Sequence, residues 1–258
     1  MNFNFAYKLV IILNKFLPTQ SIPVLMYHSV SKTPSKLSVS PENFDIQLKI
    51  LAKSGYQSLS LAQFEAYYNQ RKIPPKSVLI TFDDGLEDNY TLAAPLLRKY
   101  NFIATFFING KYIGSQASHL FVAEDRYKKI MSPEQLKKLS TQNFDIANHF
   151  YSHQPLISLS PAQIKSEYEQ NAKFLKQSIS PKTKTDFVAY PKNKTNPDVT
   201  GHLRFLGVKF GFSGHNIPAK LTNHRLNIPR IAIFNADNKL KFQAKLSPYY
   251  HMFKYLRQ

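Results

Sequence analysis

The chain of 258 residues contains no cysteine. This absence excludes disulfides, thiolate metal sites, a cysteine nucleophile and a lipid-modified cysteine anchor. Any metal ion would therefore be bound by His, Asp or Glu side chains. The lack of cysteine does not by itself indicate a cellular compartment.

Acidic residues are scarce. The chain has 16 Asp and Glu against 34 Lys and Arg, a net charge of +18, and no acidic residue follows Asp237. This imbalance favours a polyanionic neighbour, such as an anionic membrane surface, a phosphate-bearing lipid, an anionic glycan or a nucleic acid. None of the usual nucleic-acid-binding motifs is present, so nucleic acid is not an expected partner.

An uninterrupted apolar run is also missing. Residues 3–17 are apolar but interrupted by Asn4, Lys8, Asn14 and Lys15, which is too short and broken for a transmembrane helix. The residues that follow do not resemble an Ala-x-Ala cleavage site. We expect residues 1–21 to form an amphipathic helix on a bilayer or on the domain itself, with an uncleaved signal anchor as the alternative. A membrane-associated or cytoplasmic protein is thus favoured over a secreted or periplasmic one.

The remaining sequence has the composition of one large α/β domain, with 43% hydrophobic residues. Strand-like apolar runs alternate with helix-like segments, which predicts βα units around a parallel sheet or barrel. Serines followed by proline at positions 40, 132 and 160 predict helix starts. We place the domain at residues 22–237, followed by a basic C-terminal segment at 238–258. The expected strands cover 22–27, 77–83, 103–108, 144–148, 186–190, 208–212 and 228–234.

Polar residues follow several of these strands. The sequence TFDDG at positions 81–85 puts Asp83 and Asp84 at a strand end, where α/β sheets and barrels carry their chemistry. A strand, an Asp-rich turn and a helix cap would be the structural alternative. His28 ends the first strand, although a lone core histidine is a common structural feature.

The sequence HFYSH at positions 149–153 spaces two imidazoles four residues apart. One turn of helix or a helix-like loop would put both rings on one side. Two imidazoles and one carboxylate form a facial triad that leaves coordination positions open for water and substrate. The sequence therefore predicts a catalytic metal site.

These motifs together resemble the polysaccharide deacetylases of carbohydrate esterase family 4, whose motifs read Thr-Phe-Asp-Asp-Gly and His-(Ser/Thr)-x-x-His. The resemblance implies a distorted (β/α) barrel in which Asp84, His149 and His153 hold a divalent metal. Zinc is the metal that the resemblance favours, with Co, Ni, Fe or Mn as alternatives. Asp83 would then be the general base. Phe150 replaces the usual hydroxyl residue, so we expect altered surroundings of the metal rather than its loss.

The position of His28 matches the circularly permuted branch that includes poly-N-acetylglucosamine deacetylases, in which the strand with the general acid stands first. The third motif fits only in part, because Lys192 and Asn193 depart from the branch pattern Ala-Tyr-Pro-Tyr-Gly. The backbone N–H of Lys192 would still serve the oxyanion. The motif arginine is absent, and Arg230 is a candidate replacement.

The resemblance implies hydrolysis of N-acetyl groups on amino sugars of a polysaccharide, or of a lipid-linked or lipopolysaccharide glycan. The basic C-terminal third favours a substrate at an anionic membrane. A non-catalytic glycan-binding relative is the first alternative, because the third motif is altered. A basic membrane- or nucleic-acid-associated protein with relic motifs is the second.

Overall fold

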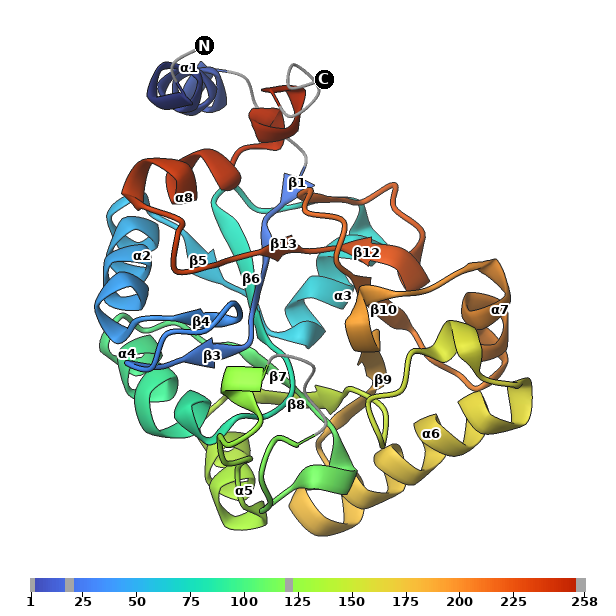
Figure 1. Cartoon of the computed structure of the whole chain (residues 1–258). Coiled ribbons are helices and arrows are strands. Elements are labelled where there is room, and N and C mark those ends of the chain that lie inside the picture. Colours follow the sequence, from blue (N-terminus) through green and yellow to red (C-terminus); the bar gives the residue numbers. More distant parts are fainter. Residues whose placement is uncertain (1–2, 17–20, 119–122, 254–258) are drawn as a thin grey trace.

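The computed structural model describes residues 3–16, 21–118 and 123–253. A nine-stranded parallel sheet curls into a nearly closed barrel with helices around its outside (Figure 1). The strands, in the order in which they pair, are β12 (Ile228–Pro229), β10 (Phe210–Ser213), β9 (Lys184–Ala189), β8 (Asp145–Asn148), β7 (Thr105–Ile108), β6 (Ser77–Phe82), β2 (Val24–Tyr27) and β13 (Ile231–Ala232), with β5 (Gln57–Ser58) also paired to β6.

One short segment closes the barrel. Ile228 pairs with Phe212 of β10, and Ile231 pairs with Leu25 of β2, so residues 228–232 contact both edges of the sheet. The expected single strand at 228–234 is therefore wrong: the structure divides it at Arg230 into β12 and β13. The division arises because the segment crosses from one edge strand to the other. Arg230 sits at this crossing and is completely buried.

The helices begin where the serine caps predict. Ser40, Ser132 and Ser160 each accept a hydrogen bond from a backbone N–H three residues on. The helix α4 (Ala94–Lys99) is preceded by a π-helical turn, η1 (Asn89–Ala93). The α-helices are α1 (Phe3–Phe16), α2 (Pro41–Lys53), α3 (Leu61–Gln70), α4 (Ala94–Lys99), α5 (Pro133–Thr141), α6 (Pro161–Phe174), α7 (Pro197–Phe205) and α8 (Lys239–Lys245).

Alternation along the strands separates two parts of the core. In β6, Val78 and Ile80 pack in the cluster that contains residues of α2 and α4. Leu79 belongs to a second cluster, formed by inner strand residues and Phe64 of α3. Because successive side chains on a strand point to opposite faces, this cluster fills the barrel interior and Asp83 continues the inward-facing row.

A helix near the start of the chain packs against segments near its end. Helix α1 packs against α8 and the 3-10 segment η8 (Pro248–Phe253), which Figure 1 shows beside it at one end of the molecule. Helix α8 also packs on α2. Among the described residues, no helix combines the length and the apolar character needed to span a membrane. Parts of the expected segments 1–21 and 238–258, namely residues 1–2, 17–20 and 254–258, lie outside the described residues.

Candidate metal centre and active site

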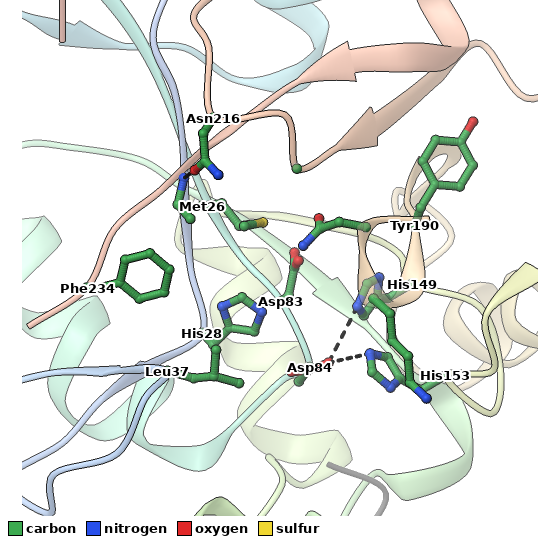
Figure 2. Close-up of a pocket in the computed structure, with 14 residues that line it drawn as sticks. Met26, His28, Leu37, Asp83, Asp84, His149, His153, Tyr190, Asn216 and Phe234 are labelled. Carbon is green, nitrogen blue, oxygen red and sulfur yellow. Dashed lines mark hydrogen bonds and ion pairs between the residues drawn. The ribbon is translucent and has the colours of Figure 1, made fainter. Parts of the chain in front are cut away.

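The carboxyl ends of β2, β6, β8, β9 and β10 meet around one cavity of about 430 Å³ (Figure 2). This volume lies in the range of roughly 300–1,000 Å³ that is usual for small-molecule sites. The structure brings six of the seven predicted site residues into the lining, and Arg230 lies directly behind it, bonded to Asp83. The lining residues are Met26, His28, Leu37, Asp83, Asp84, His149, His153, Tyr190, Lys192, Asn193, Gly214, Asn216, Ala232 and Phe234.

Asp83 and Asp84 are adjacent yet both reach this cavity. Asp83 follows the inward-facing row of β6. Asp84 has a left-handed backbone with a φ of 71°, which breaks the strand alternation and turns its carboxylate back towards the cavity. Both side chains are buried. A left-handed backbone costs a residue with a Cβ about 1–2 kcal/mol, which the surrounding structure must offset.

The two histidines come from the loop after β8, not from a helical turn. Phe150 and His153 have positive φ values of 61° and 59°, so the loop coils back on itself. Nε2 of His149 lies 3.4 Å from Oδ1 of Asp84, and Nε2 of His153 lies 3.2 Å from the same oxygen. The four-residue spacing therefore predicts correctly that the two imidazoles face one point, but a loop with left-handed residues, not a helical turn, brings them there.

Three buried asparagines hold this loop, and the sequence analysis missed them. The side-chain oxygen of Asn148 accepts from the backbone N–H of Phe150 (2.8 Å) and from Nδ2 of Asn171 (2.7 Å). Nδ2 of Asn109 donates to the carbonyl oxygens of His149 and Phe150. Of the three, only Asn148 could have been suspected from the sequence, because it immediately precedes His149. Asn109 and Asn171 are distant from the motif in sequence.

Phe150 occupies the position of the expected hydroxyl residue. Its ring is completely buried in a cluster that includes Leu156, Val188 and Tyr190. The loop is thus anchored by apolar packing on one side and by the asparagines on the other. The phenyl ring itself has no atom that could bind a metal ion.

The residues present fit a divalent cation. Oδ1 of Asp84 is buried and has no hydrogen-bond donor. Nδ1 of His149 lies 2.8 Å from the carbonyl oxygen of Ala189, so Nδ1 carries the proton and the Nε2 lone pair faces Asp84. Ligand atoms around a tetrahedral zinc ion lie about 3.3 Å apart, given bonds of about 2.0–2.1 Å. The separations of 3.2 and 3.4 Å match that value.

The electrostatics of the cluster also favour a cation. Burial alone would raise the pKa of Asp84, but the imidazoles of His153 and His149 outweigh it and hold the pKa below its usual value. Burial would lower the pKa of His149, but the carboxylates of Asp83 and Asp84 raise it above the usual value. Two buried carboxylates therefore create a negative field that a bound metal ion would neutralise.

Asp83 is paired with Arg230. Nη1 and Nη2 of Arg230 donate to the two oxygens of Asp83, each over 2.7 Å, and Nη2 also donates to Oδ1 of Asn193 (3.1 Å). Burial would raise the pKa of Asp83, but the positive charge of Arg230 outweighs it and lowers the pKa. This bidentate pair keeps Asp83 ionised and fixes its orientation. Arg230 thus supplies the guanidinium that the third motif lacks.

His28 enters from the opposite flank (Figure 2). Its carbonyl oxygen accepts from Nδ2 of Asn89 (2.8 Å), and the next residue, Ser29, donates to Asp88 (2.5 Å). Nζ of Lys128 lies 2.6 Å from the same serine hydroxyl. Burial raises the pKa of Asp88 to about 6, although Ser29 and Lys128 act in the opposite direction. These contacts connect the loop that carries His28 to η1.

Lys192 lies in η6 (Pro191–Asn193), directly after β9, where Lys192 and Asn193 both have left-handed backbones. Tyr190 holds this turn by donating its hydroxyl to the carbonyl oxygen of Leu226 (2.6 Å). The altered third motif therefore still forms a compact turn at the cavity. Its side chains differ, and its asparagine contacts Arg230.

The chain is similar to a known family of proteins. The model of the family described as "Polysaccharide deacetylase" matches residues 70–211. The poly-β-1,6-N-acetyl-D-glucosamine N-deacetylase of Staphylococcus aureus (strain MSSA476) is 31% identical over 211 residues, 81% of this chain and 72% of that protein. YxkH of Bacillus subtilis (strain 168) is 34% identical over 191 residues, 74% of this chain and 63% of YxkH, so less than two thirds of that relative is covered.

Solved structures share the fold. The Streptococcus pyogenes deacetylase PplD, solved in complex with acetate, superimposes with a TM-score of 0.77 at 25% identity and covers 90% of this chain and 100% of its own. IcaB from Ammonifex degensii gives a TM-score of 0.72 at 24% identity over 88% of this chain and 98% of its own. The expected (β/α) deacetylase barrel is confirmed.

Proposed function

This chain belongs to the polysaccharide deacetylase family, and on that premise we propose that it is a metal-dependent hydrolase that removes N-acetyl groups from amino sugars of a glycan. One observation carries the proposal: a buried Asp84–His149–His153 cluster lines the same cavity as Asp83 and His28. The cluster offers ligands for a cation, and the two flanking residues offer a base and an acid.

The metal is proposed to be zinc, with Co, Ni, Fe or Mn as alternatives. Two imidazoles and one carboxylate suit zinc and leave positions open for water and substrate. When bound, a divalent cation supplies Lewis-acid chemistry, which polarises an acetamide carbonyl and makes water more acidic. Asp84, His149 and His153 would hold it.

Asp83 is proposed as the general base. It accepts a proton from water as the oxygen of that water bonds to the acetamide carbon. Arg230 keeps the carboxylate ionised and directed into the cavity through its two hydrogen bonds. The backbone N–H of Lys192 is the proposed donor to the developing oxyanion.

His28 is proposed as the general acid. In its protonated form it donates to the sugar nitrogen as the C–N bond breaks. The oxygen of the water is thereby incorporated into acetate, and the sugar nitrogen, now protonated, leaves as a free amine. The contacts of Ser29 and Asn89 with their neighbours keep the His28 loop beside the cavity.

The substrate is proposed to be an amino sugar of a polysaccharide or of a lipid-linked or lipopolysaccharide glycan. The S. aureus relative, named for poly-β-1,6-N-acetyl-D-glucosamine, supports a polymer of N-acetylglucosamine as the first substrate to test. The net charge of +18 supports substrates held close to anionic groups. We further propose a membrane-associated or cytoplasmic location.

The test is incubation of zinc-loaded protein with β-1,6- and β-1,4-linked N-acetylglucosamine oligomers, followed by mass spectrometry. We expect stepwise loss of acetyl groups with wild-type protein and none with Asp83→Asn. Release of acetate from neither oligomer, nor from a lipid-linked N-acetylated sugar, would contradict the proposal.

A glycan-binding relative without turnover is the second candidate, favoured by the altered third motif at Lys192 and Asn193. It predicts that the oligomers bind to wild-type protein, as measured by calorimetry, while the mass spectra stay unchanged. Measurement of both properties on the same zinc-loaded sample separates the two functions.

A further inference from the structure

Helix α1 is held on the domain by one of its faces. Ala6 and Val10 are buried, and α1 packs against α8 and η8. The ring of Tyr7 stacks with that of Tyr250, with centroids 6.0 Å apart. The helix therefore has a defined side towards the protein.

A separate stripe of α1 is apolar but exposed. Phe5, Leu9 and Ile12 are 65%, 37% and 50% exposed. They are spaced i, i+4 and i+7, which puts them on one side of a helix. They account for three of the nine large exposed hydrophobic residues found in the described part of the chain. We call Phe5, Leu9 and Ile12 the α1 stripe.

The surroundings of the stripe are basic. The first acidic residue of the chain is Glu42 and the last is Asp237, so neither of the two ends that pack together contains a carboxylate side chain. Lys8 is exposed beside the stripe, and Lys239 is exposed on α8. Lys245 is not available, because it is buried against Asp237 and the carbonyl oxygen of Ala232.

We propose that the α1 stripe docks the protein onto an anionic lipid bilayer. An exposed apolar stripe with a lysine beside it, on a helix whose opposite face packs on α8 and η8, has the chemistry of an interfacial helix. Three side chains are too few for a stable protein partner, which usually needs about 800 Å² on each side. A second copy of the chain would also bring the same positive charge to the contact. Lipid phosphates complement that charge.

The test is cosedimentation of the full chain with vesicles of phosphatidylcholine alone or mixed with phosphatidylglycerol. We expect binding to the mixed vesicles that weakens with added salt, and little binding to phosphatidylcholine. Phe5→Ser/Leu9→Ser/Ile12→Ser should lower the affinity by at least about tenfold, because most of the apolar insertion is lost. Lys8→Gln/Lys239→Gln should lower it by about fivefold for each lysine.

The matched control is Ile46→Ser/Ile157→Ser/Phe205→Ser, which removes three exposed apolar side chains elsewhere on the surface. It should bind as wild type does. Equal binding by the stripe variant and this control, or no binding of wild type to either vesicle, would overturn the proposal. Self-association of wild type that only the stripe variant abolishes, measured by sedimentation velocity, would assign the stripe to a second copy instead. None of these readouts depends on deacetylation.

Discussion

Two walls of the cavity are built in different ways. The wall formed by the loops after β6 and β8 carries the carboxylates and the imidazoles, and its geometry comes from backbone conformation: Asp84, Phe150 and His153 are all left-handed. The wall formed by the barrel closure depends on a single side chain, Arg230, which spans from the crossing of β12 and β13 to Asp83. Hydrogen bonds from three buried asparagines also support the first wall, whereas the second depends on one ion pair.

The second wall also contacts the turn after β9. Arg230 reaches Asp83 at the carboxyl end of β6 from the closing segment, and its Nη2 also donates to Oδ1 of Asn193. The altered third motif is thereby connected to Asp83 through Arg230. In the first wall, three candidate ligand atoms, from Asp84, His149 and His153, lie within 4.8 Å of one another.

The largest expected effect comes from the carboxylate that joins the two walls. Asp83→Asn should lower turnover by about 10²–10⁴-fold, because the amide cannot take a proton from water. The zinc content, measured by plasma mass spectrometry, should equal that of wild type, since Asp84 and the histidines remain. Asp186→Asn, a half-exposed carboxylate on β9, is the control and should keep full turnover. Substantial activity of Asp83→Asn would remove Asp83 from its proposed role.

Removal of the side chain that holds the second wall should reduce stability. Arg230→Met leaves the carboxylate of Asp83 buried without its partner, which should lower the free energy of unfolding of the metal-free protein by about 3–5 kcal/mol. Urea denaturation measures this change. Arg225→Met, whose guanidinium lies over the rings of Tyr68 and Phe210, is the control and should cost less than about 2 kcal/mol. Similar losses for both would mean that the ion pair does not support the wall.

Asp88, in the loop after β6, accepts a hydrogen bond from Ser29, the residue after His28. The contribution of Asp88 to stability should depend on pH. A carboxyl whose pKa rises from 3.8 to about 6 on folding contributes stability that is fully present below about pH 3.8 and is lost as the pH rises to about 6. The loss amounts to about 3 kcal/mol, from about 1.36 kcal/mol per unit of pKa.

Asp88→Asn removes this ionisation. The difference in free energy of unfolding between wild type and variant should therefore shift in favour of the variant by up to about 3 kcal/mol between pH 3.8 and about 6, and then stay constant. Denaturation curves at several pH values measure it. A difference that does not change with pH would show that the pKa of Asp88 is the same in the folded and the unfolded protein.

The smallest effect is expected at the altered motif. Lys192 has a φ of 55°, which costs a side chain with a Cβ roughly 1 kcal/mol. Lys192→Gly should therefore raise the free energy of unfolding by up to about 1 kcal/mol. Because only the backbone N–H is proposed to act, turnover should change by less than about tenfold, or 1.4 kcal/mol.

Lys76 has a φ of 57° and does not line the cavity, so Lys76→Gly is the matched control. Equal stabilisation by both substitutions, with turnover preserved in both, is the expected result. A much larger loss of turnover in Lys192→Gly alone would assign a role to the lysine side chain.

The residues of the first wall could be predicted from the sequence because they lie in two short motifs. Asp83 and Asp84 end an apolar strand, and His149 and His153 are four residues apart, so short motifs record them. Sequence reasoning named Arg230 only as a candidate, because nothing in the sequence shows which strand end lies opposite Asp83. The supporting Asn109 and Asn171 left no motif at all, since a buried amide in a loop or a helix looks like many others.

The amino-acid sequence by itself determined the alternation of strands and helices, the serine helix caps, the absence of thiol chemistry and the motifs that carry the candidate metal ligands, because each depends on neighbours within a few residues. Tertiary structure alone decided the division of the closing strand at Arg230, the ion pair with Asp83 and the exposed stripe on α1. These features depend on which distant segments the closed barrel brings together, and that pairing is set by packing over the whole chain rather than by any local pattern.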